Sequence, residues 1–289
     1  RSMARVALVT CADIPEPDHD EAPALAALRA AGHDAEALAW DAPTSDPAAF
    51  DICVLRSTWN YIWQPAEFLA WVRRAASATR LFNPPAIVEA NHHKRYLVEL
   101  GRAGVPIVPT TLLRSGESME PERLLEREGW PTGAGAGIVV KPAVGGWSWN
   151  VRAFGIDQLD DARDAMAATA RIGDVLVQPI VAGYAEGRER SIAWIDGDVT
   201  HVVQKGSRLD GDEESVRLGQ KPSDEELDLV DRCLTPFGDD LMYARVDVVP
   251  DEMGRPLVGE LELIEPSLWF RLHPPALDAF VAAVERRLR

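Results

Sequence analysis

Two apolar segments near the C-terminal end of this 289-residue chain carry three acidic residues, and this combination narrows the possible folds more than any other part of the sequence. Residues 241–250 (LMYARVDVVP) and 256–264 (PLVGELELI) are predicted strands joined by a short polar turn. In a hairpin, Asp247 would face the strand of Glu260 and Glu262, which share one face because strand side chains alternate. A magnesium site would explain carboxylates on an apolar sheet. The solvated face of an antiparallel strand would explain them equally, and the two segments alone leave both interpretations open.

The first part of the chain alternates short apolar runs with helical patterns. The runs at 4–10 (ARVALVT) and 51–57 (DICVLRS) enclose an Ala- and Leu-rich helix that begins near Glu21 and ends at Gly32. This alternation is typical of an open parallel α/β sheet. Asn83-Pro84-Pro85 interrupts it, because each proline removes a backbone donor and disfavours helix in the preceding residue. A domain boundary is therefore predicted near residue 85.

Beyond that boundary the pattern is rich in strands, with helices interspersed among them. Strand-like runs cover 175–180, 190–197 and 199–206. The last two runs meet at Asp196-Gly197, a pair that accepts the positive φ of a primed hairpin turn. Segregated antiparallel strands with helices on one face indicate α+β units, so the fold class expected for the whole chain is α/β followed by α+β.

The composition excludes several classes of function. Lys and Arg total 30 against 46 Asp and Glu, and a formal charge of −16 argues against a phosphate-neutralising surface for nucleic acid. Cys11, Cys53 and Cys233 are far apart and form no CxxC pair, so neither a disulfide framework nor a cysteine zinc site is supported. No apolar run reaches the length of a membrane span, and no signal-peptide pattern follows Met3. We expect a cytoplasmic protein without nucleic-acid or membrane partners, whose oligomeric state is open.

Lys141 stands at the end of a predicted buried strand, residues 138–142 (IVVKP), and Gly145-Gly146 follows. A lysine in this position can pair with a phosphate while backbone N–H groups of the glycine loop approach the phosphate oxygens. The spacing is not that of a Walker loop. The alternative is a lysine whose stem is buried while its charge reaches solvent.

Gln178 lies at the end of another apolar strand, and Glu189 follows after a polar, glycine-containing stretch. A strand that turns into a linker can offer unpaired backbone groups to an adenine edge, and a nearby carboxylate can bind ribose hydroxyls. Any strand followed by a turn fits this description, so the segment alone is not specific.

Taken in order, these segments resemble the ATP-grasp superfamily. Lys94 opens a helix that ends in GVPIVPT, Lys141 lies in VVKP, Gln178 precedes a hinge, Glu189 opens ERSIAWIDG, and RVD (245–247) is followed by ELE (260–262). The resemblance covers about residues 90–270. It implies an ATP-grasp fold in three parts: an N-terminal open α/β domain (1–85), a first ATP-grasp subdomain (86–182) and a C-terminal subdomain with the metal site (183–289).

The resemblance also implies roles for individual residues, with ATP and Mg²⁺ as cofactors. Arg245 resembles the arginine that stabilises the transition state. The nucleotide-binding residues implied are Lys94 and Lys141 at the phosphates, Gly146 in the loop beside them, Gln178, Ile180 and Val181 at the adenine, and Glu189 at the ribose. The magnesium ligands implied are Asp247, Glu260 and Glu262. Lys205 and Arg217 fall where related ligases place additional phosphate or substrate contacts, Arg217 as a second catalytic candidate.

The match departs from the usual pattern at two points. Glu262 stands where the last motif usually has asparagine, which adds a negative charge at the metal site. Glu265-Pro266-Ser267 replaces the usual Pro-Gly, which puts the carboxylate-binding end of the acceptor site in doubt. This ELELIEP version resembles a branch near the ribosomal-S6-modification and glutathione-synthetase-like enzymes.

The resemblance implies that ATP phosphorylates a carboxylate-type oxygen and that a nitrogen nucleophile then displaces phosphate. A lid should exclude water, and the candidates are residues 132–137 (TGAGAG) and the stretch from Gly145 to Asn150. Trp147 and Trp149 would either seal the site or simply pack.

A small amino-acid-like substrate is the expected partner. Arg56 and Ser57 follow a strand of the N-terminal sheet, where α/β proteins bind ligands, and Arg56 could hold a carboxylate. Acidic residues after the first strand could receive an amino group, or could simply be part of a solvated loop. The further substrate candidates are Asp13, Glu16, Asp20, Ser267 and His273.

We therefore expect a carbon–nitrogen ligase that forms an acyl phosphate. A narrower form is a cyclo-ligase in which one molecule supplies both the activated oxygen and the nitrogen, since the chain resembles D-cycloserine synthetase-type members of the superfamily. A small-molecule kinase and a nucleotide-binding module without chemistry remain as alternatives.

Overall fold

The computed structural model describes residues 3–206 and 215–289, and its first sheet is the expected parallel one. The strand order is β2-β1-β3-β4, and all neighbours run parallel. β1 and β3 are buried on both faces, which explains their continuous apolar sequences. The elements of this part are β1 (Arg5–Thr10), α1 (Glu21–Ala30), β2 (Asp34–Ala39), β3 (Ile52–Ser57), α2 (Pro65–Ala78) and β4 (Arg80–Phe82), with short 3₁₀ turns at Pro47–Ala49 and Trp59–Trp63.

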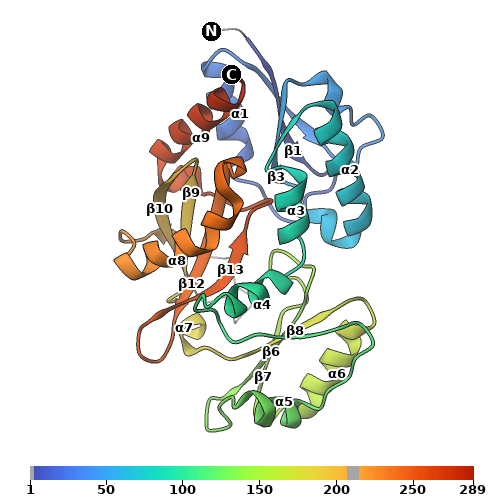
Figure 1. Cartoon of the computed structure of the whole chain (residues 1–289), viewed down its shortest axis with the longest axis vertical. Coiled ribbons are helices and arrows are strands. Elements are labelled where there is room, and N and C mark those ends of the chain that lie inside the picture. The colour runs from blue at the N-terminus through green and yellow to red at the C-terminus, as the bar shows by residue number, and fades with distance from the viewer. Residues whose placement is uncertain (1–2, 207–214) are drawn as a thin grey trace.

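A second sheet, antiparallel, forms the lower lobe in Figure 1. Its order is β5-β8-β6-β7, and α5 and α6 pack against it around a separate apolar core. Lys141 and Gln178 are carried on β6 and β8, the two central strands. The elements are β5 (Thr111–Leu113), α5 (Pro121–Glu128), β6 (Gly137–Pro142), β7 (Arg152–Gly155), α6 (Leu159–Ala170) and β8 (Val175–Pro179).

The third sheet is antiparallel and contains the acidic hairpin. Its order is β11-β10-β9-β12-β13, and β12 pairs with β13 so that Asp247 lies opposite Glu260 and Arg245 opposite Glu262. The predicted hairpin at Asp196-Gly197 joins β9 to β10. The elements are α7 (Ala182–Ala185), β9 (Arg190–Ile195), β10 (Asp198–Lys205), β11 (Val216–Leu218), α8 (Asp224–Leu234), β12 (Tyr243–Pro250), β13 (Pro256–Glu262) and α9 (Pro274–Arg287), with 3₁₀ turns at Thr235–Asp240 and Phe270–Leu272.

The first and third sheets share one apolar core. α9 returns to pack on α1, so both termini lie at the same end of the molecule (Figure 1). Val6 and Leu28 of the first part contact a core that also contains Ile195, Tyr243 and Phe280. The N-terminal sheet is therefore fixed against the sheet that carries the carboxylates.

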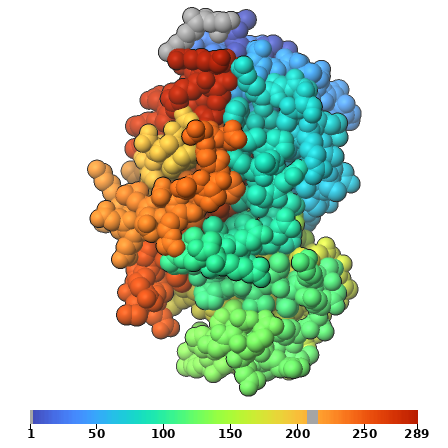
Figure 2. Space-filling view, viewed as in Figure 1, coloured from blue at the N-terminus to red at the C-terminus, as the bar shows by residue number. Residues whose placement is uncertain are grey.

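The open edge of β13 is covered by residues that precede the second sheet. α3 (Pro85–Asn91) and α4 (Arg95–Arg102) lie along it, and in Figure 2 the green-cyan residues of this segment fill the space between the upper and lower parts. The strip continues to Val108 and pairs with Val258 of β13 through backbone hydrogen bonds. Val108 N donates to Val258 O, and Val258 N donates to Pro106 O, each at 2.9 Å. An unpaired strand edge invites pairing with other chains, so this cover protects the sheet.

The sequence pattern does not predict α3, and it indicates the proline pair only as an interruption of the chain rather than as the start of a helix. Pro85 occupies the first turn of α3, where its fixed φ suits a helix and its missing N–H costs nothing. The divisions after residues 85 and 182 stay predictions, and the core beneath β13 takes side chains from residues 87–105 as well as from 229–263. Within the described residues, no helix combines the length and apolar character needed to cross a membrane.

Asn91 provides a test of how the edge cover stabilises the protein. Its buried side-chain amide donates to Leu261 O at 2.8 Å and accepts from Leu263 N at 2.9 Å. Asn91→Ala should lower the free energy of unfolding in urea by about 2–4 kcal/mol, because two buried backbone groups lose their partners. The exposed control Gln64→Ala should change it by less than about 0.5 kcal/mol. Equal effects of the two variants would contradict this role.

Candidate active site

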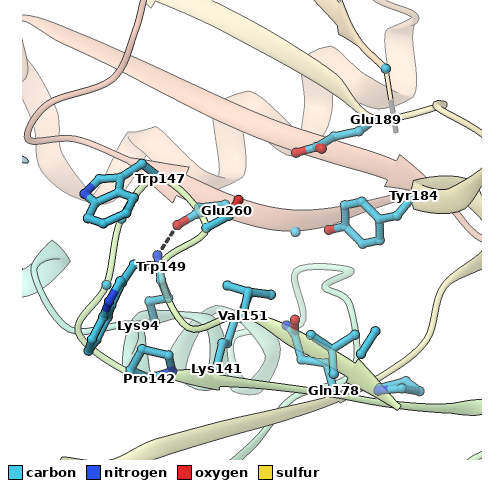
Figure 3. A pocket seen from close by; sticks show the side chains of 18 residues that line it. Lys94, Lys141, Pro142, Trp147, Trp149, Val151, Gln178, Tyr184, Glu189 and Glu260 are labelled. Carbon is cyan, nitrogen blue, oxygen red and sulfur yellow. Dashed lines mark hydrogen bonds and ion pairs between the residues drawn. The ribbon is translucent and has the colours of Figure 1, made fainter. Parts of the chain in front are cut away.

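A cavity of about 400 Å³ lies between the second and third sheets. Figure 3 shows Lys141 and Gln178 on one wall, Glu189, Tyr184 and Glu260 on the facing wall, and Trp147 and Trp149 at one end. Residues far apart in sequence therefore meet here as the ATP-grasp resemblance implies. The lining comprises Lys94, Val139, Lys141, Pro142, Gly145, Gly146, Trp147, Ser148, Trp149, Val151, Ala153, Gln178, Pro179, Tyr184, Glu189, Gly206, Gly259 and Glu260.

A smaller cavity of about 130 Å³ adjoins the first one. The two share lining residues on the loop after β6 and on β13, so they are neighbouring parts of one site. The smaller part is more polar and reaches the N-terminal sheet. Its lining comprises Glu16, Trp59, Gly146, Trp147, Ser148, Glu189, Lys205, Arg245, Glu260, Glu262, Glu265, Ser267 and Trp269.

The three carboxylates of the β12–β13 hairpin form one cluster. Asp247, Glu260 and Glu262 each offer an oxygen that lies within 4.8 Å of the other two. Such a set of hard oxygen donors is what Mg²⁺ prefers. These three residues could therefore hold a magnesium ion, with Glu262 supplying a charge where the family's usual asparagine supplies none.

Basic side chains already contact each carboxylate of this cluster. Arg245 binds both oxygens of Asp247 at 2.8 Å and reaches Glu262 at 2.6 Å. Lys94 contacts Glu260. These ion pairs keep buried charges paired in the absence of a cation, which is the condition for burying them at all.

The pKa values follow from burial opposed by these pairs. Burial disfavours ionisation of Asp247, but Arg245 and the neighbouring Lys205 hold its pKa below the ordinary value. Burial likewise opposes ionisation of Glu260, and Lys94 lowers its pKa. For Glu262, burial outweighs the nearby Arg245 and raises the pKa to about 7. A further positive charge near Glu262 would therefore favour its ionised form.

Lys205 links the cluster to the predicted ribose carboxylate. Its buried ammonium lies 2.8 Å from Asp247 and 3.1 Å from Glu189. Burial raises the pKa of Glu189 and Lys205 opposes the rise. Lys205 lines the smaller cavity beside Glu189, which lines both cavities, and this position suits a phosphate or substrate contact.

Lys141 has no carboxylate partner at ion-pair distance in the described part of the chain. Burial lowers its pKa to about 8, and the neighbouring Lys94 adds to the effect while Glu260 opposes it. An ammonium held in this state gains from an anionic ligand more than a solvated lysine does.

The loop after β6 joins the site to the N-terminal sheet. Trp147, Ser148 and Asn150 all have positive φ, so the chain makes a tight excursion here. Trp63 packs edge-on against Trp149, with ring centroids 4.4 Å apart, and against Trp147 at 6.0 Å. The two tryptophans therefore both line the larger cavity and pack. The other lid candidate, 132–137, lines neither cavity.

At the hinge, only part of the predicted set faces the larger cavity. Gln178 lines it and its amide donates to Thr110 Oγ1 at 2.8 Å. Ile180 and Val181 follow β8 and do not line it, and Ile180 N donates to Gly137 O. Arg217 is exposed on β11 and borders a separate hollow beside Lys205, so the structure does not bring it into the site.

Arg56, Ser57 and Asp20 were predicted to contact substrate, but the structure shows them bound to other parts of the chain, which corrects that expectation. Arg56 is buried and donates to Pro266 O at 2.7 Å. Ser57 is buried and donates to Thr10 Oγ1 at 2.9 Å. The Asp20 carboxylate accepts three backbone N–H bonds. None of the three lines either of the two cavities, and Arg56 and Asp20 instead bind the backbone of residues 264–270. Of the other substrate candidates, Ser267 and Glu16 line the smaller cavity, whereas His273 stacks on His201.

Sequence reasoning missed several lining residues. Trp59 and Trp269 wall the smaller cavity, and Tyr184 walls the larger one. Glu265 also lines the smaller cavity, and burial raises its pKa to about 8. Its only signal was the departure from the usual Pro-Gly motif. The aromatic residues carried no signal, since their position depends on how irregular segments fold.

The sheets and the site together are those of an ATP-grasp ligase. A structure of ATP-grasp ligase PsnB, complexed with a phosphomimetic variant of its minimal precursor, Mg and ADP, has a TM-score of 0.64 at 19% identity, covering 98% of this chain and 99% of that one. This likeness concerns the fold, and it confirms the fold class predicted from the motifs.

A more specific relationship covers the full length. Cycloserine biosynthesis protein DcsG of Streptomyces lavendulae is 32% identical, covering 99% of this chain and all of the relative. The crystal structure of D-cycloserine synthetase DcsG has a TM-score of 0.89 at 29% identity, over 99% of this chain and 100% of that one. Residues 6–83 match the family described as D-cycloserine synthetase DcsG, N-terminal domain. The chain belongs to the D-cycloserine synthetase DcsG family, and it is an ATP-dependent ligase.

The depressed pKa of Lys141 predicts a pH dependence of nucleotide binding. Below its pKa of about 8 the ammonium is charged and ATP affinity should be flat, whereas above it affinity should fall about tenfold per pH unit, because one proton must be taken up. Titration calorimetry of ATP from pH 7 to 9.5 would measure this slope. Lys141→Arg stays charged throughout, so its profile should be flat, and a slope retained in this variant would assign the titration to another group.

Proposed function

We propose that this enzyme closes a ring within one small amino-acid-like molecule. ATP phosphorylates the carboxylate of a serine derivative whose side-chain oxygen carries nitrogen, and that nitrogen attacks the activated carbon and displaces phosphate. The observation that carries this proposal is the full-length identity of 32% to a cycloserine biosynthesis protein. The size of the smaller cavity supports the proposal, since it suits one compact molecule that supplies both reacting groups.

In this proposal the larger cavity holds ATP. The adenine lies by Gln178 and Pro179, which line this cavity where β8 ends. Glu189 receives the ribose hydroxyls. The phosphates lie between Lys94 and Lys141, beside the loop that contains Gly146.

Mg²⁺ fits the carboxylate cluster of Asp247, Glu260 and Glu262. A bound ion would supply positive charge that offsets the negative charge developing during phosphoryl transfer. The chain's own contribution is to hold the three carboxylates within 4.8 Å and to release Lys94 from Glu260 toward the phosphates. Lys205, between Asp247 and Glu189, lines the smaller cavity and suits a contact to the transferred phosphoryl group.

Arg245 is the residue proposed to stabilise the transition state. Its guanidinium faces the smaller cavity and lies 4.8 Å above the Trp269 ring, which limits its movement. Preorganised N–H donors stabilise developing negative charge most when they need no reorientation. The Gly145–Asn150 loop closes the phosphate end, since an acyl phosphate would hydrolyse if water entered.

The first test is product analysis with single compounds. O-amino- and O-ureido-serine, each enantiomer alone, should give ADP and phosphate in equal amounts together with a ring product detected by mass spectrometry. Pairs of ordinary amino acids and dipeptides are the comparison. Release that requires two different compounds would make the enzyme an intermolecular ligase, and a stable phosphorylated product without free phosphate would make it a kinase.

The role of Arg245 has its own test. Arg245→Ala should leave ATP affinity within about threefold while lowering kcat by about 10²-fold or more, the scale for one lost electrostatic stabiliser. The matched control is Arg163→Ala, which removes an exposed arginine from α6 that pairs with Asp160, Glu120 and Glu122. Its kcat should not change. Unchanged turnover in Arg245→Ala would remove the role assigned to this residue.

A further inference from the structure

Residues 264–270 form an irregular segment whose backbone is held almost entirely by side chains. It follows β13 and lines the smaller cavity with three of its residues, Glu265, Ser267 and Trp269. Irregular backbone of this kind is normally solvated, because buried polar groups need partners. Here the partners come from several distant parts of the chain, so the segment has one defined conformation.

Asp20 binds the N–H side of this segment. Its carboxylate accepts from Leu268 N at 2.6 Å and from Trp269 N and Phe270 N at 2.9 Å each. The residue is 3% exposed, and the buried Arg56 guanidinium lies 3.9 Å away. Three consecutive N–H groups directed at one carboxylate form an anion-binding concavity, and here the chain fills it with its own acid.

The backbone carbonyl groups of residues 264–268 also have side-chain partners. Residues from the N-terminal sheet supply two donors, Arg56 to Pro266 O at 2.7 Å and the Trp59 indole to Glu265 O at 3.0 Å. The remaining contacts come from the third sheet: Tyr243 hydroxyl to Ile264 O at 2.9 Å, Arg245 to Ser267 O at 3.2 Å, and the His201 ring to Leu268 O at 2.8 Å.

These contacts act on the reacting region through two residues. Trp269 has φ of +46°, a left-handed conformation that is rare for a bulky residue and that the Asp20 bonds to its own N–H and to both neighbours maintain. The Trp269 ring lies under Arg245, and Ser267 O accepts from the same guanidinium. The position of the Arg245 guanidinium in the smaller cavity therefore depends on where Asp20 holds this segment.

We propose that Asp20 is a positioning residue that keeps the 264–270 segment, and with it Arg245 and the cavity wall, in the geometry in which the substrate's own nitrogen captures the acyl phosphate. If the wall moves, water reaches the acyl carbon. The water oxygen then bonds to that carbon, the bond to the phosphate oxygen breaks, phosphate leaves, and the carboxylate is regenerated. ATP is consumed without a ring. The proposal rests on the ring-closing function above.

The test is the ratio of phosphate released to ring product formed, measured with Asp20→Asn. The asparagine amide has the size of the carboxylate, but its nitrogen cannot accept from a backbone N–H and it leaves Arg56 without a counter-charge. Wild type should give a ratio of about one. Asp20→Asn should raise the ratio to about three or more, since capture by a misplaced nitrogen slows steeply with small displacements, while the KM for ATP stays within about twofold.

The ratio distinguishes positioning from a loss of folded enzyme. Asp196→Asn is the control, because Asp196 is a partly buried carboxylate paired with Arg286 and Arg287 at the far end of β9 from Glu189. It should lower the midpoint of thermal unfolding without moving the ratio, since fewer folded molecules consume ATP and form product in the same proportion.

Arg56→Lys keeps the experiment decisive if Asp20→Asn does not fold. A lysine ammonium at this buried position keeps a charge near Asp20 but lacks the guanidinium fork that reaches Pro266 O, so the ratio should rise in the same direction. Ratios of about one in every folded variant would overturn the role of Asp20 and leave ring closure standing. Wild-type enzyme that makes no ring product would instead overturn the proposed function itself.

Discussion

The charge network across β12 and β13 is the constraint on which the rest of the site depends. Asp247 is almost fully buried and can stay ionised only because Arg245 and Lys205 lie against it. The same pairs determine where Glu260 and Glu262 lie, through Arg245 and Lys94. A hairpin with apolar cross-strand neighbours supplies the rigid frame, so the acidic cluster, Lys94, Lys205 and Arg245 are parts of one electrostatic unit.

The N-terminal sheet contributes to the site although none of its residues lines the larger cavity. It shares a core with the third sheet, and residues at the ends of its strands hold the 264–270 segment in place. Trp63 extends this contact to the loop after β6 through Trp147 and Trp149. In this arrangement the first 85 residues help to shape the smaller cavity from two sides, although few of them line it.

The fold, and the placement of several residues that line the larger cavity, were predictable from sequence because their signals are local. Lys141 ends an apolar strand beside glycines. Asp247 and Glu260 lie on strands in which the alternation of side chains indicates that both point to the same face of the sheet. The substrate side was not predictable, because the chemistry of a residue does not reveal its partner. Arg56 and Asp20 have the groups that bind an amino acid, yet the chain itself occupies them, and the segment that does so has no regular structure or periodic pattern.

The strip that covers the edge of β13 has a second consequence. Lys94, which faces the larger cavity, belongs to the same strip as Asn91, Pro106 and Val108, which close that edge. A ligand that holds Lys94 therefore also holds the cover in place, since binding to the folded form stabilises whatever it contacts. Such a ligand would then also keep this sheet edge closed to pairing with other chains.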